Sequence, residues 1–349
     1  MRNSDRGRSD RDLTMTDAKV VVFGAGAIGC TLGGYLSKNG VDVTLIARPR
    51  YVEQINKNGL TIQSRTGEET AFPKASEKLD FQPDLVLLTV KSQDTVESAK
   101  QFKEFVDGVP IVSLQNGIQS IELLADVLDR ENIIGGVVAY DARIVRPGRV
   151  IFSMKEPYIT IGEAFREGGE RIKRIRNLLQ KNDVIKIRIS RNIRGALWSK
   201  LVMNVGGNAL MTLTELRIRE LMGHPKIRRL TVQLMKEAYA VTKKAGINLE
   251  SSPGFHPGVF GRMPAPILSF SISFLIRFKV TDMKYEELRF LKDIKRGKTE
   301  IDYLNGEIVE LGKKIGFPTP VNGKIVALTH RMEETGRQMS LDELLTNFK

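Results

Sequence analysis

The sequence is almost free of cysteine, with Cys30 alone among its 349 residues. A single cysteine cannot form a disulfide within the chain, which fits a reducing compartment, and we expect the cytoplasm. A long apolar run is also missing. The most apolar stretch, 263–276, contains prolines and serines and is shorter than the about 20 residues that a spanning helix needs. We therefore expect neither a transmembrane segment nor a membrane partner.

The first residues, 1–17, lack the apolar core of a secretory signal and are polar and charged. We expect a disordered tail there, with Met15 as a candidate natural start. Acidic residues are too few to balance the basic ones, which leaves a formal net charge of +13. The basic residues are scattered, often beside acids, and no basic motif interleaved with aromatics appears. This pattern favours a solvated surface that attracts an anionic cofactor and substrate over a nucleic-acid partner.

The length favours two domains. In the first half, short β-branched or apolar runs alternate with helical stretches, which predicts an α/β fold with a Rossmann-type, doubly wound parallel sheet. The expected strands are 20–23, 41–47, 85–90, 111–114 and 133–138, with further strands at 150–152, 158–161 and 184–189. The expected helices between them run from the first strand to about Lys38, over 95–105 and over 118–128.

From Ile193 onward a helical period dominates, and it predicts helices at 196–212, 227–244, 301–315 and 321–332. A mainly α-helical C-terminal domain should therefore follow the sheet. We place the boundary near Ser190, so that residues 18–190 form a cofactor-binding domain and residues 191–349 a substrate and catalytic domain.

A glycine motif follows the first expected strand and opens a helix: Gly24, Ala25, Gly26, Ala27, Ile28 and Gly29. In this context Gly24 allows a tight turn, Gly26 allows a pyrophosphate to approach the backbone, and Gly29 allows close packing of helix and strand. The helix N-terminus then offers amides to the phosphates. The alternative is a glycine-rich turn without a ligand.

The end of the second expected strand selects the dinucleotide. NAD-binding folds place an acid there for the ribose hydroxyls, whereas this chain has Arg48, Pro49 and Arg50. Arg48 can bind a 2′-phosphate through charge-assisted hydrogen bonds, so the sequence favours NADPH. The alternative is a pair of arginines that only cap a surface strand.

A lysine and two asparagines, Lys200, Asn204 and Asn208, recur every four residues in the expected helix 196–212. This spacing places them on one helix face, where they indicate either a polar cleft or an ordinary solvated stripe. A ketone that accepts a hydride needs a proton donor at its oxygen, a role that suits a partly buried lysine. Glu300 begins the expected helix 301–315, and its spacing alone gives it no role beyond that of a dipole partner.

Several motifs in a fixed order, between about Lys19 and about Arg337, resemble the ketopantoate reductase (2-dehydropantoate 2-reductase) family. They are the glycine motif, Arg48, Val90-Lys91, 114–117 (LQNG), 192–201 (NIRGALWSKL) and 299–306 (TEIDYLNG). The family reduces ketopantoate to pantoate with NADPH, on the route to pantothenate and coenzyme A.

The resemblance also implies residue roles. Lys200 matches the proton donor, and Glu300 matches the glutamate that places the lysine and the substrate. Asn204 and Asn208 match substrate-binding asparagines, and Asn116 matches an asparagine near both nicotinamide and substrate. Arg48 and Lys91 match the positions that recognise the 2′-phosphate. No metal is expected.

Two features depart from the family pattern. Leu288, followed by Arg289, stands where the family has a substrate-binding serine, and an apolar stretch, 258–278, precedes it. We expect that stretch to add core packing, with a lid or a subunit contact as alternatives, so a homodimer stays open. The other functional hypotheses are a reductase of a different 2-oxo acid and an NADPH-binding regulator without turnover.

Overall fold

The computed structural model describes residues 18–279 and 298–348. The chain divides into two units. The first comprises the described residues up to Gln115 together with Ser120–Ile193, and the second comprises Asn116–Gln119 and the chain from Arg194 onward. This division lies three residues beyond the expected boundary at Ser190, and it assigns the short segment 116–119 to the second unit.

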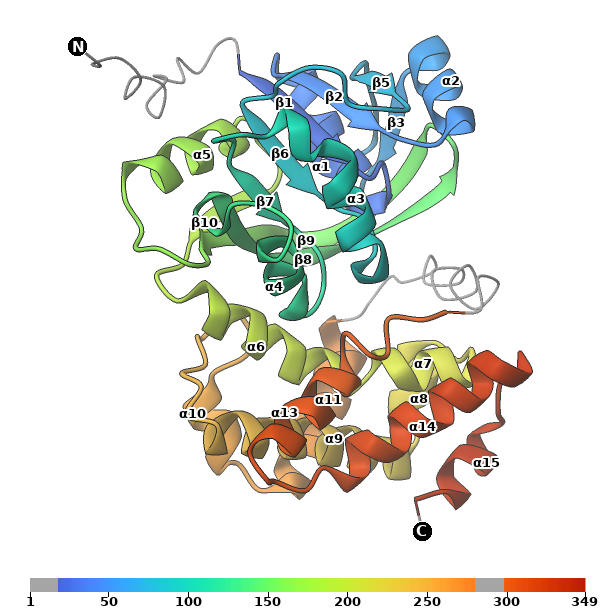
Figure 1. The fold of residues 1–349 in the computed structure, drawn as a ribbon. Helices are drawn as coiled ribbons and strands as arrows, with labels where there is room; N and C mark the ends of the chain where they lie inside the picture. Colours follow the sequence, from blue (N-terminus) through green and yellow to red (C-terminus); the bar gives the residue numbers. More distant parts are fainter. Residues whose placement is uncertain (1–17, 280–297, 349) are drawn as a thin grey trace, which may run out of the picture. The chain divides into compact units, whose positions relative to one another are not determined.

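The first unit is built on one ten-stranded sheet (Figure 1). Its strands are β1 (Lys19–Phe23), β2 (Asp42–Ile46), β3 (Leu60–Gln63), β4 (Glu68–Ala71), β5 (Lys74–Ser76), β6 (Leu85–Leu88), β7 (Ile111–Ser113), β8 (Ile133–Arg146), β9 (Arg149–Glu163) and β10 (Lys186–Ile189). Its helices are α1 (Ala27–Lys38), α2 (Pro49–Asn58), α3 (Thr95–Phe102), α4 (Gln119–Ala125) and α5 (Glu170–Gln180), with short 3₁₀ turns at Ser92–Asp94, Lys103–Phe105 and Arg130–Asn132.

Six neighbouring strands, in the order β5-β2-β1-β6-β7-β8, run parallel. The central strand β6 is apolar and fully buried, as expected for a strand covered on both faces. After β1 the chain adds β2 on one side and later returns to add β6 on the other. The strand order therefore reverses at β1, and such a switch point is where doubly wound sheets bind ligands.

The Rossmann-type fold class is confirmed, but the sheet is larger and less uniform than expected. Strand β9 pairs antiparallel with β8, and the two strands expected at 150–152 and 158–161 are one strand. Strands β3, β4 and β5 were not expected, because they are short and β4 is mostly polar and exposed (EETA). Both β3 and β10 pair with β9, at its two ends.

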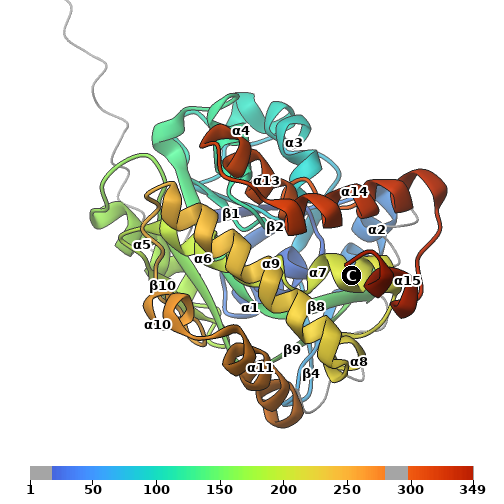
Figure 2. The same ribbon diagram turned by 90° about the horizontal axis from the view of Figure 1, so that it is seen from below.

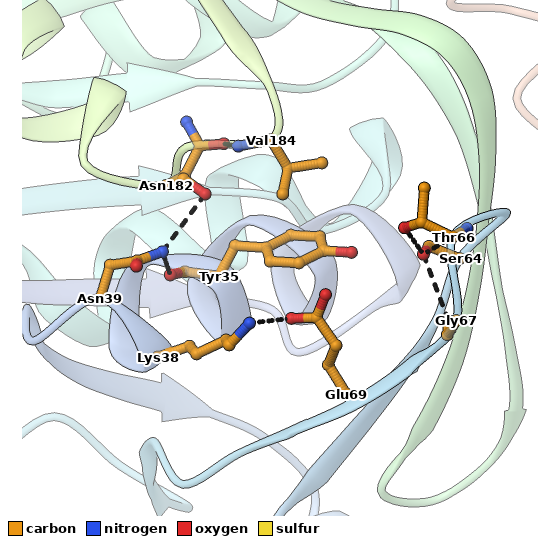
Figure 3. A network of polar contacts seen from close by, with 9 residues as sticks. All are labelled: Tyr35, Lys38, Asn39, Ser64, Thr66, Gly67, Glu69, Asn182 and Val184. Carbon is orange, nitrogen blue, oxygen red and sulfur yellow. Dashed lines mark hydrogen bonds and ion pairs between the residues drawn. The ribbon is translucent and has the colours of Figure 1, made fainter.

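Polar contacts fix the end of α1 that lies away from the glycine motif (Figure 3). Lys38 forms an ion pair with Glu69 of β4, and Asn39 donates through Nδ2 to the carbonyl oxygens of Tyr35 (3.0 Å) and Asn182 (3.4 Å). Burial, followed by the charge of Glu69, raises the pKa of the Tyr35 hydroxyl. The helix that begins at the glycine motif is thus anchored at its opposite end.

The second unit is helical, as expected. Its helices are α6 (Ile193–Asn204), α7 (Asn208–Thr214), α8 (Ile218–Gly223), α9 (Pro225–Lys244), α10 (Pro257–Arg262), α11 (Ala265–Lys279), α13 (Asn305–Lys314), α14 (Pro320–Thr335) and α15 (Leu341–Thr346). The long helix α9 contacts α8, α11, α13 and α14, and Figure 2 shows it between α11 and the pair α13–α14. No helix in the described parts of the chain is both long and apolar enough to cross a membrane.

Over residues 258–274, where the burial of side chains is described, the apolar stretch adds core packing on one face and exposes another. Phe260 of α10 and Leu268 of α11 are buried, and α11 packs against α8 and α9. Ile267, Phe270 and Phe274, however, are 52%, 72% and 55% exposed. The expectation of core packing is therefore wrong for this outer face.

Candidate functional site

The glycine motif forms the turn between β1 and α1 in the first unit. Gly24 adopts a φ of +103°, and a side chain there would collide with Val90, 2.7–2.8 Å away, in the segment that follows β6. A methyl group at Gly29 would lie 2.5 Å from both the Gly24 carbonyl oxygen and Thr89 Oγ1. Both glycines are therefore required by the protein's own packing.

Gly26 differs, because it is not required by packing. A methyl group there would meet nothing closer than 3.9 Å, an ordinary van der Waals distance, so packing tolerates a side chain at Gly26. Gly26 is the N-cap of α1, whose first turn, including Ala27 and Ile28, carries no acid and exposes helix-terminal amides. Ala25 fixes the loop before the helix, because its amide donates to the Ile46 carbonyl (3.0 Å), and the helix-terminal amides that follow suit the phosphates of a dinucleotide.

Arg48 lies two residues beyond the end of β2, which is paired with β1 up to Phe23 and Ile46. Its side chain is exposed, and it is the N-cap residue of α2. The only nearby acid of this strand, Asp42, lies at the opposite end, where Lys74 Nζ donates to it (2.8 Å). The carboxyl end of β2 therefore presents positive charge beside the glycine turn.

Lys91 lies on the other side of β1, three residues beyond β6, and is partly buried. Its backbone is held by Gln115 at the end of β7, whose Nε2 donates to the Lys91 carbonyl oxygen (3.3 Å) and to Thr95 Oγ1 (2.7 Å). Parallel strands end at the same edge of the sheet, so Arg48 and Lys91 flank the glycine turn from its two sides.

Asn116 belongs by its contacts to the second unit and is partly buried. Its neighbour Gly117 has a φ of +84°, and a methyl group on Gly117 would lie 2.5 Å from the carbonyl oxygen of Tyr303. The turn that carries Asn116 therefore packs directly on the segment 300–304, which carries Glu300.

Lys200 and Asn204 lie one turn apart in α6, and both are partly buried. The prediction of one continuous helix through Asn208 is wrong, because α6 ends at Asn204 and Asn208 begins α7. The turn between them contains Gly206 and Gly207, and side chains from other helices bind its carbonyl groups. Thr231 Oγ1 donates to the Gly206 oxygen (2.9 Å), and Asn305 Nδ2 donates to the Val205 oxygen (3.2 Å).

Glu300 is partly buried and lies in a turn rather than at a helix start. The prediction of a helix from Ile301 is wrong by four residues, since α13 begins at Asn305. The turn is closed by backbone bonds from Tyr303 to Glu300 (3.1 Å) and from Gly306 to Ile301 (2.9 Å). His330 of α14 bonds to the exposed Asp302 carboxylate within it (2.8 Å).

Four residues that support these groups were not predicted: Thr89, Gln115, Thr231 and Asn305. Thr89 Oγ1 bonds to the Gly24 carbonyl oxygen (2.5 Å) and so holds the glycine turn. Gln115 and Asn305 stand inside motifs quoted above, without an assigned role, and each of the four binds a group distant in the sequence, a contact that local spacing does not predict. Leu288 and Arg289 lie outside the described residues. Within 18–279 and 298–348, no cluster of three or more His, Cys, Asp or Glu side chains could hold a metal ion.

Comparison with known families matches most of the chain in two segments. Residues 20–165 match the family "Ketopantoate reductase PanE/ApbA", and residues 192–333 match "Ketopantoate reductase PanE/ApbA C terminal". The first match contains the glycine turn, Arg48, Lys91 and Asn116. The second contains Lys200, Asn204, Asn208 and Glu300.

Individual relatives agree with these matches. The 2-dehydropantoate 2-reductase of Pyrococcus horikoshii is 29% identical over 91% of this chain and 98% of its own length. The crystal structure of a PanE/ApbA family ketopantoate reductase from Ralstonia eutropha is 29% identical, with a TM-score of 0.75 over 91% of this chain and 99% of that one. A D-mandelate dehydrogenase, solved with NADH and anilino(oxo)acetate, has a TM-score of 0.78 over 91% of this chain and 99% of its own, but its 23% identity indicates a shared fold alone.

Proposed function

The chain belongs to the ketopantoate reductase family and is an oxidoreductase, and on this premise we propose that it reduces 2-dehydropantoate (ketopantoate) to pantoate with NADPH, on the route to pantothenate and coenzyme A. Both the cofactor residues of the first unit and the polar residues of the second stand in the matched segments. One observation carries the proposal: Lys200 and Asn204 lie one turn apart in α6, and both are partly buried. The turn that follows them is held by the buried side-chain amide of Asn305.

The cofactor is proposed to be held by the first unit. The amides at the start of α1 and the side-chain-free backbone of Gly26 suit the pyrophosphate, and Arg48 and Lys91 suit the 2′-phosphate. No acid stands at the end of β2 to bind a free 2′-hydroxyl or to repel a phosphate. The D-mandelate dehydrogenase that shares this fold was solved with NADH, but a shared fold does not decide which cofactor this chain binds. The proposal of NADPH therefore depends on these residues.

NADPH, when bound, supplies a hydride to the ketone carbon of the substrate. Lys200 is proposed to donate a proton to the ketone oxygen as negative charge develops there, so that the oxygen becomes the hydroxyl of pantoate. The amides of Asn116, Asn204 and Asn208 can hold the carboxylate and hydroxyl groups of the substrate. Glu300 is proposed to orient Lys200 and the substrate.

A second candidate is the reduction of another 2-oxo acid. Leu288 motivates it, because the family has a hydroxyl donor at this position. The loss of one such donor costs about 0.5–1.5 kcal/mol of binding, so we propose that ketopantoate is accepted with weaker affinity than in the family's serine-containing members.

Purified protein, NADPH and a panel of 2-oxo acids test both proposals, with the loss of cofactor absorbance as the measurement. Leu288→Ser should bind ketopantoate more tightly if the lost contact matters. If the protein reduces another acid well and does not reduce ketopantoate, the substrate assignment is wrong while the cofactor assignment stands. If it binds NADPH and reduces none of the acids, the regulator hypothesis replaces both.

A further inference from the structure

A buried chain of side-chain amides connects the two substrate segments of the second unit. Asn305 and Asn322 are both fully buried, and Asn305 Nδ2 donates to Asn322 Oδ1 (2.9 Å) as well as to the carbonyl oxygen of Val205 (3.2 Å). Asn322 Nδ2 in turn donates to Glu237 Oε1 (2.8 Å) and to the Leu234 carbonyl oxygen (3.2 Å).

Glu237 fixes the far end of this chain. Its carboxylate also accepts the backbone amides of Val321 (3.0 Å) and Asn322 (2.8 Å) at the start of α14, where the helix dipole favours negative charge. A carboxylate only accepts, so the amide nitrogen of Asn322 must face it and the oxygen of Asn322 must face Asn305. The orientation of the Asn305 amide is thereby fixed as well, with its nitrogen toward two acceptors.

This orientation leaves the other end of Asn305 unsatisfied. Its Oδ1 is buried and has no hydrogen-bond partner among the residues that the structure describes. An apolar side chain at this place would remove this unpaired acceptor, but it would leave the Val205 carbonyl oxygen and Asn322 Oδ1 without the donor that they share. The contribution of Asn305 is therefore its bond to these two groups, which ties the Val205 carbonyl to the start of α13.

The two segments that Asn305 joins are those that carry the proposed substrate residues. Asn305 directly follows the turn of Glu300, which also contacts the Asn116–Gly117 segment through Tyr303. The carbonyl that it binds, that of Val205, lies in the break between Asn204 at the end of α6 and Asn208 at the start of α7.

We infer that Asn305 is a positioning residue that sets the break bearing Asn204 and Asn208 at a fixed place relative to the turn bearing Glu300. It acts through its bond to Val205 and does not touch the substrate. The inference rests on the proposed function, because it assigns Asn305 a part in binding the same 2-oxo acid.

Steady-state kinetics of Asn305→Ala test it, with the 2-oxo acid that the wild-type protein reduces best. Thr231→Val is the matched control, since it removes an equally buried bond to the same break (to Gly206) without touching the Glu300 turn. We expect Asn305→Ala to raise KM for the acid about tenfold or more with KM for NADPH within about twofold, and Thr231→Val to lower Tm with a smaller change in KM for the acid.

A double-mutant cycle with Glu300→Ala gives the second readout. The effect of Asn305→Ala on kcat/KM should largely vanish in the Glu300→Ala background, whereas the effect of Thr231→Val should persist. If Asn305→Ala is not obtained folded, Asn305→Ser, which keeps one donor, is measured against the same outcomes.

Equal kinetics for Asn305→Ala and Thr231→Val, or additive effects in both cycles, would overturn the inference while leaving the proposed function intact. A wild-type protein that reduces no 2-oxo acid overturns the proposed function first, and the role of Asn305 with it. The two failures are therefore distinguished by the wild-type assay.

Discussion

The glycine turn of the first unit and the helix break of the second are held in different ways. The turn is fixed by main-chain bonds from Gly24 and Ala25 to the Ile46 carbonyl oxygen, by the bond from Thr89 Oγ1 to the Gly24 oxygen, and by the close approach of Val90. The break is fixed by side chains, Thr231 and Asn305, that bind its carbonyl groups. The turn thus depends on the absence of side chains at Gly24 and Gly29, whereas the break depends on the identity of particular side chains.

This difference predicts how each region responds to substitution. A change at the turn should alter cofactor binding, or the packing of the first unit, and leave the substrate groups in place. A change at or near the break should alter the reaction of the acid and leave the cofactor bound. The variants below test that separation, from the largest expected effect to the smallest.

Lys200→Ala should give the largest effect. The loss of a positioned proton donor should lower kcat by about 10²–10⁴-fold, with the affinity for NADPH nearly unchanged, because Lys200 belongs to the second unit. Met203→Ala on the same helix, where the side chain is 41% exposed, is the control and should keep kcat within about twofold of wild type. Retention of most activity by Lys200→Ala would require another proton donor.

Arg48→Asp should affect the other region alone. It should weaken NADPH binding by about 1.5–3 kcal/mol, the scale of a charge-assisted hydrogen bond, and should leave NADH binding less affected. Lys57→Asp, with the same change of charge at the far end of α2, is the control. Cofactor titrations measure both, and equal use of NADPH and NADH by the wild-type protein would contradict the assignment of Arg48.

Two glycine variants separate packing from ligand binding within the turn. Gly29→Ala forces a methyl group to 2.5 Å from the Gly24 oxygen, so it should lower the free energy of unfolding by about 1–3 kcal/mol and weaken NADPH binding. The methyl group of Gly26→Ala would lie no closer than 3.9 Å to any neighbouring atom, so this variant should leave Tm unchanged while it raises KM for NADPH. Thermal melts without and with NADPH measure the contrast. Equal losses of Tm would show that Gly26, too, serves packing.

The same contrast explains how far the sequence predicts this molecule. The glycine turn, Arg48 and the parallel strands follow from local rules, and the fold class and the family are confirmed. The break between α6 and α7 was missed because its stabilising partners, Thr231 and Asn305, lie 25 and 100 residues from the carbonyls that they bind. The start of α13 was misplaced for a related reason, since the turn 300–304 packs on Gly117, far away in the sequence.

The smallest expected effect concerns Cys30, which lies in α1 just behind the glycine turn. Cys30 is 1% exposed, its thiol donates to the Ala25 carbonyl oxygen (3.3 Å), and burial raises its pKa to about 12. At pH 8 the thiolate is therefore almost absent, and we expect the folded protein to react with a thiol reagent far more slowly than the urea-unfolded chain.

The raised pKa of Cys30 also makes stability depend on pH on the alkaline side. Above the ordinary thiol pKa of 9.0 the unfolded chain has lost this proton while the folded protein still holds it, up to about pH 12. The unfolded state then binds fewer protons, so the free energy of unfolding should fall as pH rises through this window, by at most about 1.4 kcal/mol per pH unit from this group. Burial also raises the pKa of Tyr140, so this tyrosine adds to the fall in the free energy of unfolding at the upper end of the same pH window.

Cys30→Ala should remove the contribution of the thiol and leave that of Tyr140. Urea titrations of the wild-type protein and the variant at pH 8 and pH 10.5 should therefore show a smaller loss of unfolding free energy for the variant. Identical losses would mean that the thiol is not buried as the packing of the glycine turn requires.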